Sequence, residues 1–149
     1  MNRPCVAPAC LAGAVVAIMA VASGSVLAQD APLFTPLFSA EEFQSRRQRV
    51  ASEIGDGSLA VVQGAASPPG YERFRQSNEM FYLSGIEAPH AYLVIEGGSG
   101  RSTLYLPERN ERRESSEGKV LSAQDAALVN RYSGTAATRR LARMETDLS

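Results

Sequence analysis

The stretch "FRQSNEMFYLSG", Phe74 to Gly85, places an arginine, two amides, a carboxylate and three aromatic side chains ahead of a closing Ser-Gly pair. The run "MFYLS" within it predicts a buried strand, and the polar residues before it can hydrogen-bond to backbone groups at an entry turn. Two interpretations stay open. Arg75 either holds carbonyls or a carboxylate where the strand begins, or joins Phe81 and Tyr82 in a rim or interface element, since arginine and aromatic side chains are enriched at binding hot spots.

The segment before this stretch predicts a helix with a well-marked start. Ser39 and Glu42 have the spacing of a capping box, and Phe38 and Phe43 occupy the two positions of a hydrophobic staple. Gly55 predicts the end of the helix. The basic side chains that we expect to reach water from this helix, partly by snorkelling, are Arg46, Arg47 and Arg49.

Further strands are predicted on both sides of the opening stretch. Ser58–Gln63 is an almost continuous apolar run, which indicates burial on both faces of a sheet. Ala91–Glu96 and Arg101–Pro107 are joined by the Gly-rich link Gly97–Gly100, and this arrangement favours a β-hairpin.

Charged and helical segments follow the hairpin. The charge run Glu108–Lys119 predicts a solvated loop. Ser122 predicts the cap of a second helix, with Asp125 at its N3 position, and the tail Ala137–Ser149 has helical composition. The order helix, strand, strand, hairpin, helix predicts an α/β domain in which a mixed β-sheet is flanked by helices.

The first 28 residues predict a secretory signal peptide. Arg3 supplies a positive start, Leu11–Val21 is a short apolar core, and "SVLAQD" offers a cleavage site after Ala28. The alternative is an uncleaved N-terminal anchor, although the core is short and rich in alanine for a membrane span. We therefore expect an exported protein, periplasmic or secreted, with a lead-in linker at residues 29–37 and one domain at residues 38–149.

Cleavage of this signal changes the charge and the cysteine content. Removing 28 of the 149 residues leaves 121, enough for one hydrophobic core. Arg3 is lost, so 14 basic residues face 16 acidic ones and the net charge is −2. No nucleic-acid partner is expected, because that requires a basic patch, and no membrane partner after cleavage. Cys5 and Cys10 leave with the signal, so neither disulfides nor thiolate metal ligands are expected in the domain.

The residues of the domain predict no catalytic constellation. His90 is the only histidine, it has no neighbouring cluster of carboxylates or thiols, and an exposed loop histidine is a more frequent outcome than a metal ligand. The "GGSG" link joins two strands, whereas a phosphate-binding loop opens a helix. The carboxylates of residues 108–117 are interleaved with arginines and lack the shielded cleft that paired catalytic acids need.

Three segments carry a family resemblance: "RRQRVASEIGDGSLAVVQG", "YERFRQSNEMFYLSGIEAPHAYLVIEGG" and "STLYLPERNERRESSEGKVLS". In order, they resemble the N-terminal domain of Xaa-Pro aminopeptidases (aminopeptidase P), and prolidases share a related domain. The resemblance runs from about Phe43 to Ser122. Its most specific parts are the pattern R-Q-x-x-x-x-F-Y-x-S-G and the opening of helix, Gly-Asp-Gly and strand.

The resemblance implies a metallopeptidase family whose members remove an N-terminal residue preceding proline, usually with two manganese ions. It implies that the metal ligands, two Asp, one His and two Glu, lie in a larger C-terminal "pita-bread" domain, which is the expected partner of this chain. In such enzymes the N-terminal domain shapes the substrate entrance and forms subunit contacts, so a homo-oligomer is also expected. The resemblance carries over a rim role for Phe81 and no catalytic or metal-binding residue.

The sequence departs from the family in two places. Members often carry a tryptophan in the pattern E-x-W-x-G, whereas Ser116 stands at that position of Glu114–Gly118, which removes a large apolar anchor for docking. The tail stops inside a helical pattern, so we expect the end of the domain to be missing and a sheet edge or core face to be exposed.

The sequence therefore supports more than one functional reading. The first hypothesis is the exported N-terminal portion of an Xaa-Pro aminopeptidase, inactive when alone. The alternatives are a non-catalytic interaction or oligomerisation module and the equivalent domain of a prolidase-type dipeptidase.

Overall fold

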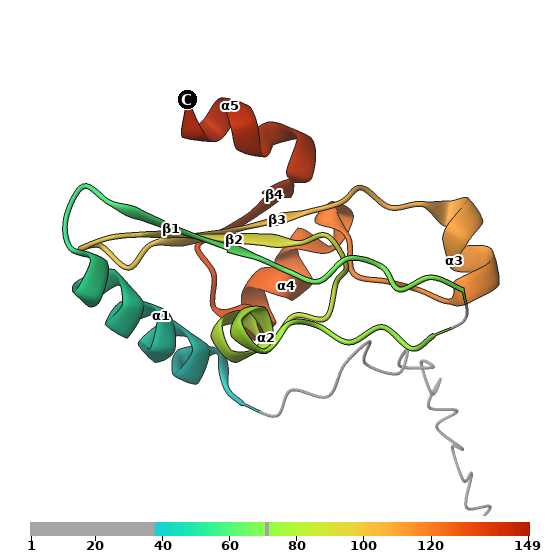
Figure 1. The fold of residues 1–149 in the computed structure, drawn as a ribbon, viewed down its shortest axis with the longest axis horizontal. Helices are drawn as coiled ribbons and strands as arrows, with labels where there is room; N and C mark the ends of the chain where they lie inside the picture. The colour runs from blue at the N-terminus through green and yellow to red at the C-terminus, as the bar shows by residue number, and fades with distance from the viewer. Residues whose placement is uncertain (1–37, 71) are drawn as a thin grey trace, which may run out of the picture. The chain divides into compact units, whose positions relative to one another are not determined.

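The structure, a computed structural model, describes residues 38–70 and 72–149. The expected signal peptide at residues 1–28 and the linker at residues 29–37 lie outside the described residues and stay predictions. The described part contains a four-stranded sheet with helices packed on it (Figure 1). The strands are β1 (Leu59–Gln63), β2 (Tyr92–Glu96), β3 (Ser102–Leu106) and β4 (Ala137–Arg140). The α-helices are α1 (Ala40–Ile54), α2 (Asn78–Ser84), α3 (Glu111–Glu117), α4 (Ala126–Ser133) and α5 (Met144–Leu148).

The sheet is mixed and has the order β1-β2-β3-β4. The β1–β2 and β2–β3 pairs are antiparallel, and the β3–β4 pair is parallel. This confirms the predicted α/β class with a mixed sheet and the predicted hairpin. The crossover through α3 and α4 brings β4 beside β3, as a parallel pair requires.

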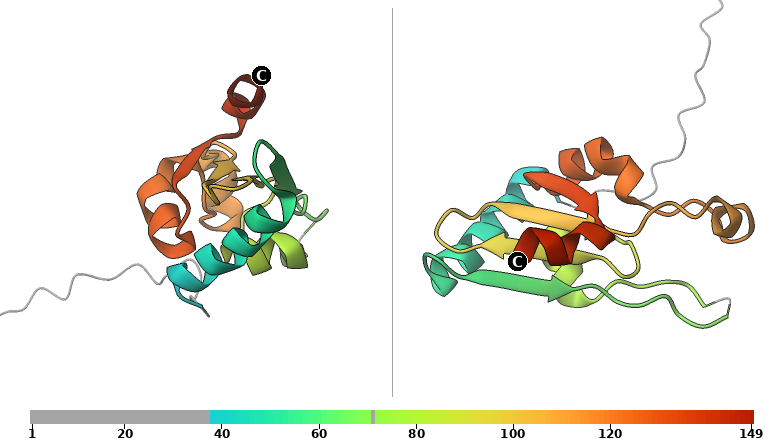
Figure 2. Two further views of the ribbon diagram at one scale, coloured as in Figure 1. Left: turned by 90° about the vertical axis from the view of Figure 1, so that its left-hand side faces the viewer. Right: turned by 90° about the horizontal axis from the view of Figure 1, so that it is seen from above.

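The core lies between the sheet and three helices. Helices α1, α2 and α4 cover one face of the sheet, and α5 lies on the opposite face (Figures 1 and 2). Among the described helices, none combines the length and apolar character of a membrane crossing. The fully buried core side chains include Met80 of α2, Leu93 and Ile95 of β2, Leu104 and Leu106 of β3, and Val129 of α4.

The expectation that the first strand is buried on both faces is wrong. β1 is an edge strand in which Leu59 and Val61 are 52% and 49% exposed, whereas Ala60 and Val62 pack against the core. Helices cover the sheet next to β1 on one face only, so the apolar run is half-buried.

The predicted strand "MFYLS" is a helix, α2. Ser77 caps it by accepting a hydrogen bond from the Met80 N–H, and Gly85 ends it in a left-handed conformation with φ 67°. The helical period points Met80 and Leu83 into the core and leaves Tyr82 half exposed. A short apolar run does not separate a strand from a buried helical turn, and the capping serine decides the outcome here.

Two segments near the C-terminus also differ from expectation. The charge run contains α3 rather than a loop, although none of the residues of this helix is buried, so the solvated part of that prediction agrees with the structure. Residues Ala137–Arg140 form β4 rather than helix, because their pairing with β3 overrides local composition. The predicted second helix is confirmed by α4 and the 3₁₀ turn Ala123–Asp125 that precedes it.

Candidate functional site

Where α1 meets α2, a cation is held among three rings. The Arg46 guanidinium carbon lies 4.2 Å from the ring centroid of Phe38, 5.4 Å from that of Phe43 and 4.3 Å from that of Tyr82. The two phenylalanine rings pack edge to face with their centroids 6.0 Å apart, as the predicted hydrophobic staple requires. We call these four side chains the arginine–aromatic cluster, in which cation–π attraction holds the guanidinium against the rings.

Hydrogen bonds fix the position of Arg46 in this cluster. Its Nε donates to Glu42 Oε1 and its Nη1 to the backbone carbonyl of Tyr82, both at 2.9 Å. Only 7% of Arg46 is exposed, so the expectation that it reaches water is wrong. The outer surfaces of Phe38 and Tyr82 stay 43% and 50% exposed. The cluster therefore offers rigid aromatic contact area on a fixed scaffold, which suits binding rather than bond-making chemistry.

Arg47 lies deeper and holds the ends of two helices together. It is fully buried, and it donates through Nη1 to the Leu83 carbonyl at 2.7 Å and through Nη2 to the Gly134 carbonyl at 2.8 Å. These carbonyls lie at the C-terminal ends of α2 and α4, where the helix dipoles favour a cation. Burial lowers the pKa of Arg47 to about 10. The prediction that Arg47 reaches water is therefore wrong, because carbonyls replace the water.

The closing Ser-Gly pair of the opening stretch has a packing reason. Gly85 has φ 67°, and a Cβ atom there would lie 2.4 Å from the Phe43 ring. Ser84 is buried, donates to the Met80 carbonyl at 2.7 Å, and accepts from the Ile86 N–H at 3.2 Å. The pair thus lets the chain turn sharply under the cluster without leaving a buried polar group unpaired.

Gln76 joins three segments of backbone before α2. Its Oε1 accepts from the Ala65 N–H at 2.7 Å and from the Ser77 N–H at 3.0 Å, and its Nε2 donates to the Ala88 carbonyl at 2.8 Å. This arrangement confirms the prediction that polar side chains of the stretch bond to backbone at a turn. Gln76 holds the end of β1, the start of α2 and the entry to β2 in place.

The predicted rim residues are not all brought together. Tyr82 belongs to the arginine–aromatic cluster, Phe81 is half-buried in α2, and Arg75 is exposed. Within the described part, no hydrogen bond or ion pair joins Arg75 to another residue. Arg46, rather than Arg75, stacks on Tyr82, and the buried position of Arg46 is the feature that sequence reasoning missed. The signal that could have revealed this burial is the position of Arg46, three residues after the staple residue Phe43 on the same helix.

A second candidate region is a cavity of about 720 Å³ beside α3. Its lining carries both signs of charge, including Arg73, Glu87, Arg113 and Lys119. Because acidic and basic side chains both line it, the cavity favours neither an anion nor a cation.

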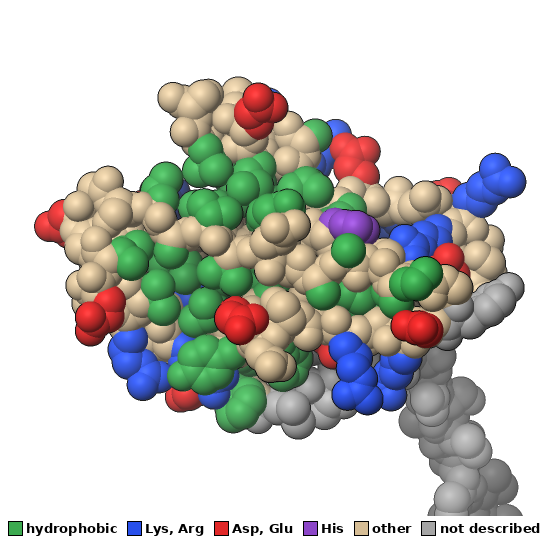
Figure 3. All heavy atoms as spheres, in the orientation of Figure 1, with side chains coloured by type: hydrophobic (Ala, Val, Ile, Leu, Met, Phe, Trp, Pro, Cys, Tyr) green, Lys and Arg blue, Asp and Glu red, His purple; other side chains and the backbone are tan. Residues whose placement is uncertain are grey.

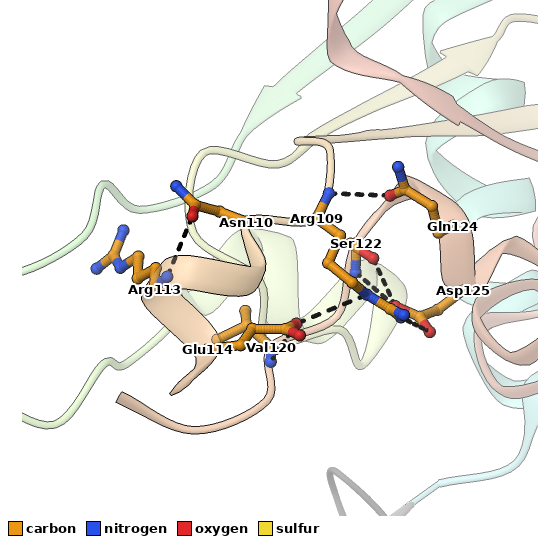
Figure 4. A network of polar contacts seen from close by, with 8 residues as sticks. All are labelled: Arg109, Asn110, Arg113, Glu114, Val120, Ser122, Gln124 and Asp125. Atoms are coloured by element: carbon orange, nitrogen blue, oxygen red, sulfur yellow. Dashed lines mark hydrogen bonds and ion pairs between the residues drawn. The ribbon is translucent and has the colours of Figure 1, made fainter. Parts of the chain in front are cut away.

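Arg109 organises the wall of this cavity (Figure 4). Its Nη2 donates to Asp125 Oδ1 at 2.5 Å, its Nε faces Glu114 Oε1 at 3.8 Å, and its backbone N–H donates to Gln124 Oε1 at 2.9 Å. Burial by itself raises the pKa of Asp125, but hydrogen bonds from Ser122 and Arg109 outweigh it and hold that pKa below its usual value. The charge run is thus solvated but ordered.

The single histidine does not form a metal site. His90 is exposed, has φ 57°, and its Nε2 accepts from the Ser67 N–H at 3.3 Å. In residues 38–70 and 72–149, no three His, Cys, Asp or Glu side chains gather in a way that could hold a metal ion. The described residues therefore do not fit the two manganese ions that the resemblance implies for the family.

Comparisons with known proteins agree with this architecture. Residues 43–148 match the family model of the aminopeptidase P N-terminal domain. The chain is 35% identical over 92 residues to intermediate cleaving peptidase 55 of Schizosaccharomyces pombe, covering 56% of this chain and 19% of that protein. It is 31% identical over 101 residues to Xaa-Pro aminopeptidase 3 of Dictyostelium discoideum, covering 63% of this chain and 19% of that protein.

Solved structures share the fold. Escherichia coli aminopeptidase P with the inhibitor Pro-Leu superposes with a TM-score of 0.63 at 24% identity, over 74% of this chain and 26% of that chain. A zinc-substituted form of the same enzyme with product matches equally, with a TM-score of 0.63.

The mixed sheet, its helical layer and the arginine–aromatic cluster define an α/β domain whose described residues build no metal centre. The chain belongs to the aminopeptidase P N-terminal domain family. It spans about a fifth of the length of the two curated relatives described above.

Proposed function

We propose that this chain serves as the N-terminal, non-catalytic domain of an exported Xaa-Pro aminopeptidase. The observation that carries the proposal is the family match over residues 43–148, together with relatives that are named Xaa-Pro aminopeptidase and are about five times longer than the matched region. We assign the removal of an N-terminal residue before proline, and the manganese that supports it, to the part of the relatives beyond this match. The zinc-substituted relative supports a metal-dependent reaction there.

The role proposed for the domain itself is to form part of the wall around the substrate entrance. The ring of Tyr82 is exposed and is held in place by the Arg46 guanidinium stacked on it. This supports the role, because a rigid ring loses little entropy on contact. Phe81 and Arg75 keep the rim role predicted from the sequence. In a complete enzyme, Phe81→Ala should weaken substrate fit or assembly; unchanged kinetics together with unchanged oligomer size would return this segment to a purely structural role.

A peptidase assay tests the division of labour. The 149-residue chain, supplied with Mn²⁺ and an Xaa-Pro peptide, should release no free N-terminal amino acid above a metal-free blank. The matched control is a full-length relative, which should show metal-dependent turnover under the same conditions. Turnover by the chain alone would overturn the proposal.

Export is tested separately. Cell fractionation followed by N-terminal sequencing should find the chain outside the cytoplasm and beginning at Gln29. A product that keeps residues 1–28 would favour the anchor alternative.

A further inference from the structure

The edge of the sheet formed by β1 carries unpaired backbone groups. In the described residues β1 pairs with β2 alone. The Gly64 N–H donates to the Ala91 carbonyl and the Gly97 N–H to the Ser58 carbonyl, both at 2.8 Å. Antiparallel partners alternate between bonded and non-bonded pairs, so residues 58, 60, 62 and 64 bond to β2. Leu59, Val61 and Gln63 therefore direct their N–H and C=O groups away from β2, and of these groups the Gln63 carbonyl also accepts a long hydrogen bond from Ser77 Oγ at 3.5 Å.

This edge lacks the charged residues and prolines that keep edge strands apart. From Gly57 to Ala66 there is no charged residue and no proline, and charge and proline are the usual protection against edge pairing. The side chains of Leu59 and Val61 lie on the sheet face opposite the core, 52% and 49% exposed. Figure 3 shows apolar side chains gathered on the side of the molecule where β1 lies in Figure 1. The edge is thus open in both backbone and side chain.

We propose that β1 pairs antiparallel with β1 of a second copy of this chain, around a two-fold axis at Val61. The outward groups of residues 59, 61 and 63 favour this register, because it is the one in which all three residues bond across the axis. Val61 then faces Val61 of the second copy, and Leu59 faces its Gln63. The three facing pairs exchange about six hydrogen bonds and join the two four-stranded sheets into one.

The local sequence fits a two-fold axis. A residue at the axis meets its own copy, so a charge there would repel itself, and β1 places valine at the centre. In the same register, Gly57 and Ser58 face Ala65 and Gly64 of the second copy, which are small, uncharged residues. An extended peptide would have to lose conformational freedom to occupy this edge, whereas β1 of a second copy is already a strand. These features favour a second copy over a peptide.

Cysteine pairing tests the register directly. In a background with Cys5→Ser and Cys10→Ser, Val61→Cys should form a disulfide-linked dimer under mild oxidation, since bonded antiparallel pairs hold Cα atoms about 5.5 Å apart. Leu59→Cys is the matched control on the same strand. Its copies would lie four residues apart along the strand, roughly 13 Å, and should not link. The double variant Leu59→Cys/Gln63→Cys should restore linkage.

Sedimentation velocity of the full chain measures the dimer without cross-linking. The chain should show a concentration-dependent monomer–dimer equilibrium, and Val61→Lys should weaken it by on the order of tenfold or more, because two lysines meet at the axis. Leu128→Lys, which charges an exposed leucine of α4 outside the edge, should leave the equilibrium unchanged. Circular dichroism checks that each variant keeps its fold.

Each alternative result overturns the proposal. A monomer at all concentrations excludes the pairing, and a dimer that survives Val61→Lys uses another surface. Equal linkage of the Val61→Cys and Leu59→Cys variants means collision without a fixed register. Open-ended oligomers mean association that does not close about a two-fold axis. If an added peptide dissolved the dimer and bound the monomer, the edge would be a peptide-binding site instead.

Discussion

Two arginine centres in this domain use the same side chain in opposite ways. Arg47, under α2 and α4, is fully buried and is held by the carbonyls of Leu83 and Gly134. Arg109, beside α3, has a side chain that is 29% exposed and is held by the carboxylates of Asp125 and Glu114. The first centre is part of the core and the second is part of the surface, although both look like surface charge in the sequence.

The difference shows that the partner, rather than the charge, decides what an arginine contributes. Carbonyls at helix ends leave the buried positive charge without a countercharge, and the pKa of Arg47 is lowered to about 10 by burial. Around Arg109 the hydrogen bond and charge of Asp125 raise the pKa of the guanidinium instead. We therefore expect loss of Arg47 to affect the whole fold and loss of Arg109 to affect one segment.

The largest effect is expected at Arg47. Arg47→Ala should lower the free energy of unfolding by about 4 kcal/mol, because it opens a cavity and leaves two buried carbonyls without donors. Arg47→Met, which refills the space, should lower it by about 2 kcal/mol, the share of the carbonyls. Urea unfolding followed by circular dichroism measures both. A loss below about 0.5 kcal/mol for Arg47→Ala would place this arginine among ordinary surface residues and break the comparison.

Gln76 gives the next largest expected effect. Gln76→Ala removes the partners of the Ala65 N–H and the Ala88 carbonyl, and should lower the free energy of unfolding by about 2 kcal/mol. Gln44→Ala is the matched control, since Gln44 is an exposed glutamine of α1, away from both this network and the β1 edge. The same urea titration compares them, and an equal small loss in both variants would mean that water replaces the Gln76 amide without cost.

Local sequence signals predicted the elements that are marked by caps and turns. Ser39 with the Phe38–Phe43 staple, the Gly-rich hairpin link and Ser122 with Asp125 all act through neighbours in sequence, and the structure confirms each of them as a start or a turn. Glu42 is an exception within its capping pattern, because its carboxylate pairs with Arg46.

The elements that sequence analysis missed depend on distant partners. The burial of Arg47 requires carbonyls 36 and 87 residues away, and β4 exists because its backbone pairs with β3. The short apolar run of α2 fits a strand as well as a helical turn, and the cap at Ser77 is what makes it a helix. For the candidate site, the sequence offered Tyr82 as a possible rim residue, and the structure leaves its ring half exposed. The sequence selected Arg75 as the partner cation, whereas Arg46 arrives from another helix.

A smaller and local effect is expected at Arg109. Arg109→Met removes the ion pairs that hold α3 to Ser122–Asp125, so the segment should open while the core stays folded. Hydrogen exchange should show faster exchange of the Val120 amide, which donates to Glu114, with little change in β2. Arg112→Met is the control, because Arg112 lies on α3 and is exposed. Faster exchange throughout β2 would mean that the surface centre supports the whole fold, contrary to the comparison.

The smallest effect is expected where α5 meets the sheet. Asp147 accepts from Arg139 at 2.8 Å and from Tyr105 at 3.3 Å, and the Arg139 bond, with the charges around it, holds the pKa of Asp147 below its usual value of 3.8 despite some desolvation. A lowered folded-state pKa adds stability above pH 3.8, and that stability is lost as the pH falls through the lower, folded value. Asp147→Asn should therefore flatten the acid side of the melting-temperature profile between pH 6 and about 2.

Glu145→Gln is the control for this profile, because Glu145 lies on the same helix and makes no hydrogen bond or ion pair with another described residue. It should leave the acid slope unchanged. An identical profile for Asp147→Asn and the wild type would show that the Arg139–Asp147 pair contributes nothing measurable, as many exposed ion pairs do. Arginine would then stabilise this domain only in two settings. One is the core, where backbone carbonyls accept from a buried guanidinium, and the other is a site such as Arg109, where several carboxylates converge on one guanidinium.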